Sequence, residues 1–271
     1  MTATTIPPTP TIEVALARRP GRPIPTTRLV RTELRKMFNT RSGCWMLVSI
    51  GVLSVIATGA VIMFAPDSEI TYENFSRAIG LPMSVILPVI AILAVTSEWS
   101  QRSGLTTFTL VPSRGRVIEA KALATLVVGV GSVAVAFTVG ALGNVAGSAL
   151  AGVDTVWDIS LSAAPQIVLG NLVGMAIGFT LGVVLRSSAA AIVGYFVTSF
   201  VMPGILVLLA QVRPWFEDLQ SWIDWNQTQV TLFDGVTNTG QEWAMLASTT
   251  SIWIVVPVVV GLLLLRRSEV K

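Results

Sequence analysis

The sequence contains six long apolar segments, and these constrain the fold more than any other feature. They cover residues 44–65, 79–97, 122–143, 162–185, 189–210 and 247–265. Each is close to the ~20 residues that a helix needs to cross about 30 Å of hydrocarbon. Inside a bilayer the backbone has no water to bond, so a segment of this kind forms a helix. The chain is therefore predicted to be an all-α polytopic membrane protein with six transmembrane helices.

Composition supports a membrane protein and removes several functions from consideration. Apolar residues make up 52% of the chain and charged residues 12%, and no long polar stretch is available to build a separate soluble domain. The sequence has no histidine, which excludes HExxH zinc sites and Ser-His catalytic pairs. The single Cys44 excludes a disulfide within the chain. We expect no catalytic residue, no metal site and no nucleic-acid partner.

The sequence before the first apolar segment divides into two parts. Residues 1–26 hold six Pro and six Thr, and such a segment buries too little apolar surface to offset its ordering entropy. We expect a disordered cytoplasmic tail there and a single membrane domain over residues 27–271. Within residues 27–42, one helical face carries Val30, Leu34, Met37 and Phe38, and arginines occupy the others. This spacing predicts an amphipathic helix on the membrane surface, with an ordinary basic flank as the alternative.

The distribution of basic residues predicts the orientation. If the N-terminus is cytoplasmic, sixteen of the eighteen Lys and Arg residues fall on that side, and only Arg77 and Arg213 fall on the other. Most acidic residues fall outside. Cytoplasmic loops carry an excess of Lys and Arg, so both termini are predicted to be cytoplasmic.

The last outer loop, residues 211–246, is rich in tryptophan. It carries Trp215, Trp222, Trp225 and Trp243. Tryptophan favours the headgroup region, where its ring is in apolar surroundings and its N–H finds a partner. We expect one or two short amphipathic helices that lie on the outer interface or dip into it, with an unstructured loop as the alternative.

The fourth apolar segment has a regular glycine spacing. Its glycines are Gly170, Gly174, Gly178 and Gly182. A glycine at every fourth position makes a groove that lets another helix approach closely. That helix belongs either to the same subunit or to a second one. Prolines at positions 82, 88 and 165 mark places where a transmembrane helix tolerates a kink.

Charged residues are absent from all six apolar segments. A charge at the centre of a membrane helix costs about 2.5–3.5 kcal/mol on insertion scales and often marks an ion or proton path. Its absence disfavours a proton-coupled or ion-coupled carrier. A translocation path would then use hydroxyl and apolar groups, for which the candidates are Met83, Ser84, Tyr195, Thr198, Ser199 and Met202. Ordinary packing is the alternative role for the same residues.

Two stretches carry a resemblance to a known family. The N-terminal TRLVRTELRKMFNTRSGCW resembles the amphipathic segment before the first span in permease subunits of ATP-binding-cassette (ABC) transporters of the type 2, exporter-like class. TSEWSQRSGLTTFTLVPSRGRVIEAK is similar to that family's loop between its second and third spans. The Glu-Trp-Ser-Gln-Arg sequence looks closest to the actinobacterial branch. The loop departs from the family pattern at one point. In the family a Gly follows the Glu more closely and precedes a Thr, whereas here Gly104 comes later and precedes Leu105. The geometry of the helix in this loop therefore stays open.

The resemblance covers nearly the whole chain from about residue 27 and implies one subunit of a transporter. In such families two permease subunits, identical or different, form the membrane path. Two ATPase subunits dock on its cytoplasmic side with ATP and Mg²⁺, in the inner membrane of a bacterium. The sequence has no GxxxxGK phosphate loop, so ATP hydrolysis is expected on the partner.

In that family the helix between spans two and three couples the ATPase to the membrane helices. The matching positions here are Gln101, Arg102, Thr106, Thr107, Phe108, Pro112 and Arg114. A short helix with an apolar edge laid in a groove is a recurrent contact between proteins. Glu98 ends the second span and Lys121 opens the third, so a Glu–Lys or Glu–Arg pair there would hold this segment at the membrane boundary.

An uncharged path favours a lipophilic or amphiphilic cargo, expelled outward. The main alternative is a membrane scaffold or channel that acts without an ATPase. A membrane-embedded enzyme is disfavoured, because no group of catalytic residues is evident. Co-purification of an ATPase would separate the transporter from these alternatives.

Overall fold

The computed structural model describes residues 24–100, 114–160, 162–236 and 239–267, which form helices and turns but no strand. The helices are α1 (Thr26–Asn39), α2 (Arg41–Phe64), η1 (Asp67–Glu69), α3 (Tyr72–Ser100), α5 (Arg114–Ala151), α6 (Ala163–Leu185), α7 (Ser188–Phe196), α8 (Met202–Val212), α9 (Pro214–Ile223), α10 (Trp225–Phe233), α11 (Gly240–Thr250) and α12 (Val256–Arg267). Two π-helical segments, η2 (Val197–Val201) and η3 (Ser251–Val255), join α7 to α8 and α11 to α12. The predicted all-α fold is confirmed.

Six helical segments are long and apolar enough to cross a membrane. They are Gly43–Phe64, Tyr72–Trp99, Gly115–Ala151, Ala163–Leu185, Ser188–Val212 and Gly240–Leu264. The fifth and sixth of these run through η2 and η3 without leaving the helical path. The prediction of six membrane-spanning helices is thus confirmed by length and composition.

The helix α5 is longer than the apolar segment that predicted it. It has 38 residues, because the Ala-rich sequence after the apolar stretch still favours a helix. It ends where Gly152 takes a φ of 71°, a left-handed conformation that glycine adopts at low cost. The helix α3 likewise continues through Pro82 and Pro88. Pro165 lies in the first turn of α6, where its missing N–H would have no helical partner in any case.

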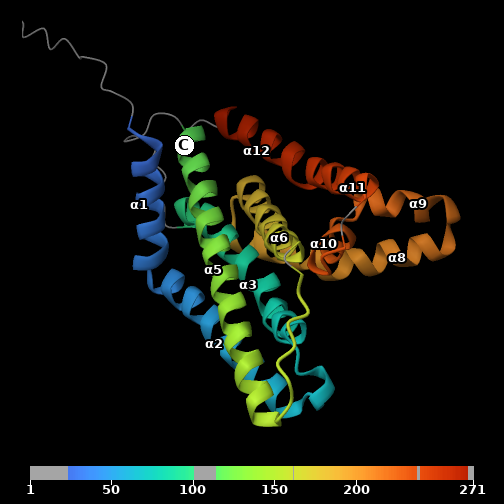
Figure 1. The fold of residues 1–271 in the computed structure, drawn as a ribbon. Helices are drawn as coiled ribbons and strands as arrows, with labels where there is room; N and C mark the ends of the chain where they lie inside the picture. The colour runs from blue at the N-terminus through green and yellow to red at the C-terminus, as the bar shows by residue number, and fades with distance from the viewer. Residues whose placement is uncertain (1–23, 101–113, 161, 237–238, 268–271) are drawn as a thin grey trace, which may run out of the picture.

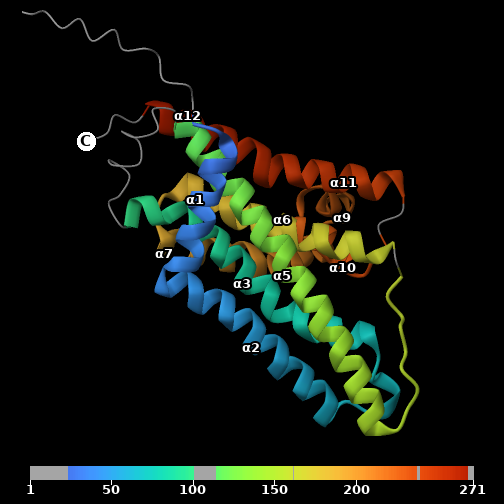
Figure 2. The same cartoon turned by 60° about the vertical axis from the view of Figure 1, so that its left-hand side comes forward.

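The helices lie close together at one end of the molecule and diverge toward the other. In Figure 1, α1, α2 and α5 form one side, while α8, α9, α11 and α12 form the other. Figure 2 shows α2 and α5 running away from α11 and α12. The helices α3, α6 and α10 lie between them, and α3 contacts both α5 and α6. We call the converging end, where α1 lies, the α1 end. The diverging ends are the η1 end, beside the end of α5, and the α9 end.

Two apolar clusters hold these helices together. The larger one packs Ile79 and Leu87 of α3 against Met175 of α6 and further residues of α2 and α5. The second surrounds α10, whose Trp225 and Leu232 are buried against α6 and α7. The short helix α10 is therefore part of the core of the bundle.

Candidate functional site

Four charged side chains from three helices meet at the α1 end. Lys121 of α5 places its Nζ 2.6 Å from Glu33 of α1 and 3.2 Å from Glu98 of α3. Lys36 of α1 lies 2.7 Å from Glu33 and 3.1 Å from Glu98. The two ammonium groups and two carboxylates alternate, so each contacts two opposite charges. We call these four residues the charge cluster, and it includes the predicted pair of Glu98 and Lys121.

Three members of the charge cluster are buried. The exposed fractions are 7% for Glu33, 3% for Glu98 and 2% for Lys121. The Lys121 ammonium also donates to the backbone carbonyl of Ala94 at 3.0 Å. Burying a charge costs several kcal/mol, and only close opposite charges and hydrogen bonds offset this. The charge cluster therefore specifies how α1, α3 and α5 lie relative to one another.

Lys36 is the half-exposed member. Partial burial by itself lowers its pKa, but hydrogen bonds and charge interactions with Glu33 and Glu98 outweigh this, and the net shift of the pKa is upward from 10.5. A raised lysine pKa favours the protonated form in the folded protein. The interactions within the charge cluster thus keep Lys36 protonated at physiological pH.

Residues 101–113 connect two of the helices that the charge cluster joins. Glu98 lies in the last turn of α3, and Lys121 lies two turns into α5. The guanidinium of Arg116 donates to the backbone carbonyl of Ile24, which ties the start of α5 to the residues before α1. Of the predicted coupling residues, Gln101, Arg102, Thr106, Thr107, Phe108 and Pro112 lie outside the described residues, and Arg114 is the first residue of α5.

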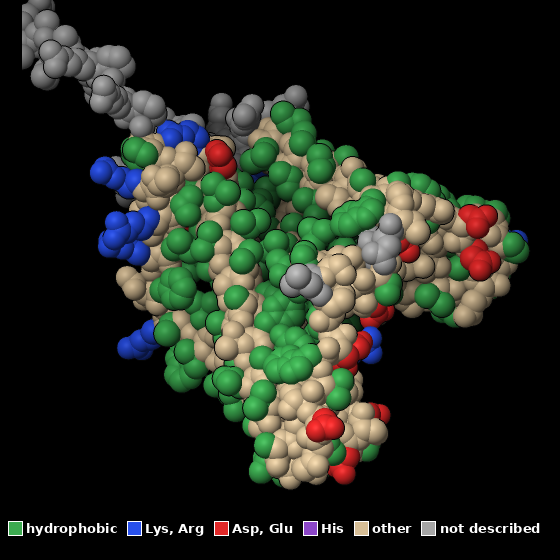
Figure 3. Space-filling model, in the orientation of Figure 1, with side chains coloured by type: hydrophobic (Ala, Val, Ile, Leu, Met, Phe, Trp, Pro, Cys, Tyr) green, Lys and Arg blue, Asp and Glu red, His purple; other side chains and the backbone are tan. Residues whose placement is uncertain are grey.

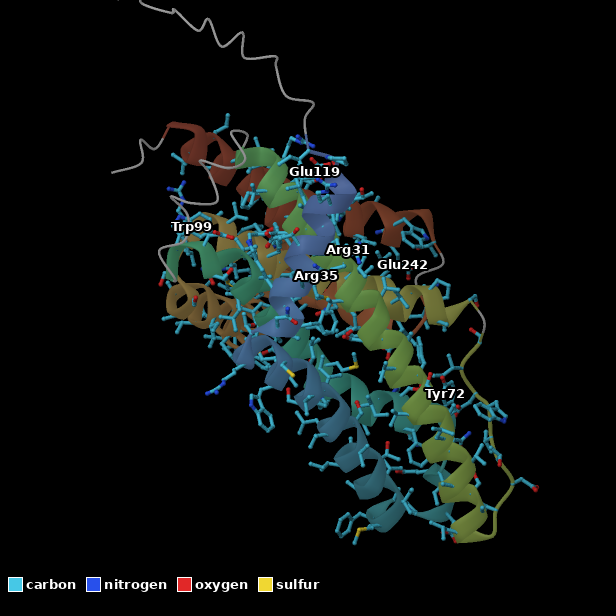
Figure 4. All side chains as sticks on the ribbon, turned by 90° about the vertical axis from the view of Figure 1, so that its left-hand side faces the viewer. Arg31, Arg35, Tyr72, Trp99, Glu119 and Glu242 are labelled. Atoms are coloured by element: carbon cyan, nitrogen blue, oxygen red, sulfur yellow. The ribbon has the colours of Figure 1, made fainter. Side chains whose placement is uncertain are left out.

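A cavity of about 270 Å³ lies beside the charge cluster. The joint between α1 and α2 forms one wall, with Met37, Thr40 and Met46. The joint is stable because Thr40 leaves the helical conformation and its hydroxyl accepts the Gly43 N–H at 3.2 Å. The exposed side of α1 carries Arg31 and Arg35 (Figure 4). One face of α1 therefore contacts α3 and α5, and the other is basic.

The four glycines of α6 lie against helices of the same chain. A Cβ atom at Gly178 would come within 2.6 Å of the Pro88 carbonyl oxygen, and one at Gly182 within 3.3 Å of the Ile92 carbonyl oxygen, both in α3. At Gly170 and Gly174 the neighbours are Phe233 and Gln229 of α10. Gln229 also donates to the Gly170 carbonyl at 2.8 Å. The glycine row thus lets α3 and α10 approach α6.

The candidate path residues take part in contacts between helices. Met83 is buried in the larger apolar cluster. The Tyr195 hydroxyl donates to the Ser84 carbonyl at 2.8 Å, which joins α7 to α3. Asn226 donates to the Thr198 carbonyl at 3.0 Å, which joins α10 to η2. Ser199 and Met202 follow in η2 and α8. These contacts suit packing, and a role in a path stays a prediction.

The four tryptophans of the last loop do not share one environment. Trp215, Trp222 and Trp243 are 68%, 36% and 42% exposed, whereas Trp225 is 1% exposed and its ring centre lies 6.2 Å from that of Tyr195. The described residues of this loop include the short helices α9 and α10 and the start of α11, which carries Trp243. Trp225 is buried within the protein because α10 packs between α6 and α11, and the position of the loop at the outer interface stays a prediction.

A family model described as "ABC-2 family transporter protein" matches residues 31–270. The match includes the charge cluster and all six membrane-spanning segments. No curated protein matches the chain.

Proposed function

Because the chain belongs to the ABC-2 family of transporter proteins, and is thus a multi-pass permease subunit of an ABC transporter, we propose that a separate ATPase drives it from the α1 end. Two cytoplasmic ATPase subunits bind there with ATP and Mg²⁺. A second permease subunit, identical or different, completes the membrane path. Both termini face the cytoplasm of a bacterial cell.

The charge distribution supports this orientation. Lys and Arg side chains gather over the α1 end in Figure 3, whereas Asp and Glu side chains gather at the η1 and α9 ends. The α1 helix supplies Arg28, Arg31 and Arg35 to the basic surface. Asp67 and Asp154 belong to the η1 end, and Glu217 belongs to the α9 end. Cytoplasmic surfaces of membrane proteins are enriched in Lys and Arg.

The observation that carries the coupling proposal is the charge cluster. Residues 101–113 follow α3 just after Glu98 and precede α5, in which Lys121 lies two turns from the start. A force on this segment acts on α3 and α5, and the charge cluster passes it to α1 through Glu33 and Lys36. The three helices therefore respond as one body. Rigid-body movement of packed helices is a common response of switching proteins.

The cargo that we propose is lipophilic or amphiphilic and is expelled from the cell. The six apolar segments of the sequence carry hydroxyl groups such as those of Ser84 and Thr198 but no charged side chain. A path lined in this way suits an apolar solute better than a free ion, whose desolvation it could not offset.

The test is co-purification combined with a coupling variant. The full chain, isolated gently from its own cells, should bring down an ATPase in roughly equal amount. Replacing Thr106, Phe108 and Arg114 together by alanine should release that ATPase, or uncouple its hydrolysis from transport, with membrane insertion unchanged. Replacing the exposed Asp154 at the η1 end is the matched control.

Two outcomes would contradict the proposal. Recovery of the chain without any ATPase would favour a scaffold or channel. Full ATPase coupling in the triple variant would show that residues 101–113 are not the contact with the ATPase.

A further inference from the structure

A second cavity lies at the opposite end of α3 from the charge cluster. It has a volume of about 330 Å³ and lies between α3, α6, the end of α10 and the segment that joins α5 to α6. We call it the α3–α6 cavity. Its lining differs from that of the cavity beside the charge cluster, because the described charges around it do not balance.

Three carboxylates and one guanidinium line the α3–α6 cavity, which leaves a surplus of two negative charges among its described residues. Arg77 lies 2.7 Å from Glu73 and 3.3 Å from Asp234. Asp158 accepts the backbone N–H of Glu73 at 2.7 Å. No cationic side chain of the described residues lies within ion-pair distance of Asp158. The cavity therefore attracts a positive charge.

A buried side chain of α6 adds an unused acceptor. Asn171 lines the α3–α6 cavity and is 6% exposed. Its Nδ2 donates to the Ile167 carbonyl at 2.9 Å, and since a carbonyl only accepts, this contact determines which side-chain atom is Oδ1. The Oδ1 atom has no hydrogen-bond partner among the described residues. A buried acceptor of this kind favours a ligand that brings a donor.

The rest of the lining combines apolar residues with three serines, and it is held in place. Leu81, Ile167 and Phe233 contribute apolar surface. The segment that carries Asp158 is fastened to α3, because the Tyr72 N–H donates to the Val156 carbonyl at 3.1 Å. The Tyr72 ring, labelled in Figure 4, lies 5.1 Å from that of Trp157. A largely preformed cavity that combines apolar surface with polar groups is typical of a small-molecule site.

We propose that the α3–α6 cavity binds an organic cation, an ammonium or similar N–H donor attached to an apolar body. Asp158 and Asp234 supply the opposite charge, Asn171 accepts a hydrogen bond, and the apolar wall covers the body of the ligand. Among the described residues, no three acidic side chains lie close enough to hold a metal ion. The surplus charge therefore suits a larger cation. Anions are repelled, and a ligand without donors leaves Asn171 unpaired.

The experiment measures binding to the full chain in nanodiscs of neutral lipid, without any ATPase. The probe is phenylbutylammonium, followed by equilibrium dialysis, and phenylbutanol and phenylbutyrate share its apolar body. The cation should bind saturably and about tenfold more tightly than the alcohol, the size of one charged hydrogen bond. Its affinity should fall with added salt, because Asp158 and Asp234 are exposed.

Two variants locate the binding. Asp158→Asn with Asp234→Asn should lower the affinity for the cation about tenfold, while the amide oxygen at position 158 still caps α3. Asn171→Leu should weaken binding as well. The control is Asp154→Asn, which removes an exposed charge at the same end of the molecule but outside the cavity.

Equal binding of the three probes, or unchanged affinity in the double Asp variant, would overturn the proposal. Circular dichroism of each variant shows whether its helices are intact, and the double variant alters only exposed side chains. Failure of this test leaves the proposed transport function standing, because neither ATPase nor transport enters the measurement.

Discussion

The two ends of α3 carry opposite kinds of polar site. At the α1 end, two lysines and two glutamates satisfy one another, and three of the four are buried. At the other end, the α3–α6 cavity has more carboxylates than cations, and Asn171 has an oxygen without a partner among the described residues. A balanced cluster stabilises one arrangement of helices. An unbalanced one attracts a ligand of opposite charge.

The difference assigns different tasks to the two ends. Charges that are buried and mutually paired are costly to separate, so the α1 end suits the transmission of force. Carboxylates that stay in contact with water keep their solvation and can exchange partners. Of the four predictions that follow, three test one end of this comparison and one tests the contact between α3 and α6 that lies between the two ends.

The largest effect is expected for Lys121→Met. The change leaves Glu33 and Glu98 buried with only Lys36 nearby, so the free energy of unfolding should fall by about 3–5 kcal/mol. Unfolding by SDS titration in mixed micelles measures it. Adding Glu33→Gln to the same chain should recover part of the loss, because it removes one unpaired charge. A single variant as stable as the parent would show that the charge cluster does not hold the helices.

Gly178→Ala tests the contact that places α3 against α6. The new Cβ would lie 2.6 Å from the Pro88 carbonyl oxygen, which is backbone and cannot turn aside. We expect a loss of about 1–3 kcal/mol of unfolding free energy. The matched control is Gly131→Ala in α5, where a Cβ would meet nothing within 4 Å. That change should stabilise the chain by about 0.5–1 kcal/mol, and equal effects of the two changes would argue against close packing at Gly178.

Lys36→Met should cost less than Lys121→Met, because the Lys36 side chain is 44% exposed and its partners keep Lys121. Its loss should be about 1 kcal/mol or less. The pKa of Lys36 is raised, so its contribution is present below pH 10.5 and disappears only as the pH rises through the higher folded value. Parent and variant should therefore differ equally at pH values from about 6 to 9. A difference that vanishes in that range would contradict the role given to Lys36.

The smallest effect on stability is expected for Asp234→Asn. It removes an exposed pair with Arg77, at 3.3 Å and with side chains 44% and 61% exposed. Such pairs contribute about 0–1 kcal/mol, so the unfolding midpoint should hardly change. A large loss of stability would show that Asp234 stabilises the fold as the charge cluster does, and the two ends of α3 would then not differ in this respect.

Local patterns in the sequence predicted a large part of this molecule. Hydropathy alone determines six membrane-spanning helices, because a lipid environment leaves the backbone no other way to satisfy its polar groups. The glycine spacing of α6 predicted a close approach. Glu98 and Lys121 were placed at the ends of neighbouring apolar segments as candidates for a charge pair, and their charged groups lie 3.2 Å apart.

Other features depend on contacts between residues far apart in the chain. Glu33 and Lys36 were seen only as part of a basic amphipathic segment, although their partners Lys121 and Glu98 lie 88 and 62 residues away. The four charges lie on three helices that are far apart in the sequence, so the sequence does not show that they meet. A signal was present in the i, i+3 spacing of Glu33 and Lys36, which places both on one face of α1.

The sequence by itself determined which segments are helices and which of them suit a membrane, because those properties follow from the neighbours of each residue. Only the tertiary structure decided which polar groups meet and which stay without a partner. Trp225 and Trp215 have the same side chain and lie in the same loop, yet one is buried and the other exposed. Burial depends on which helix packs against which, and that is a property of the whole chain.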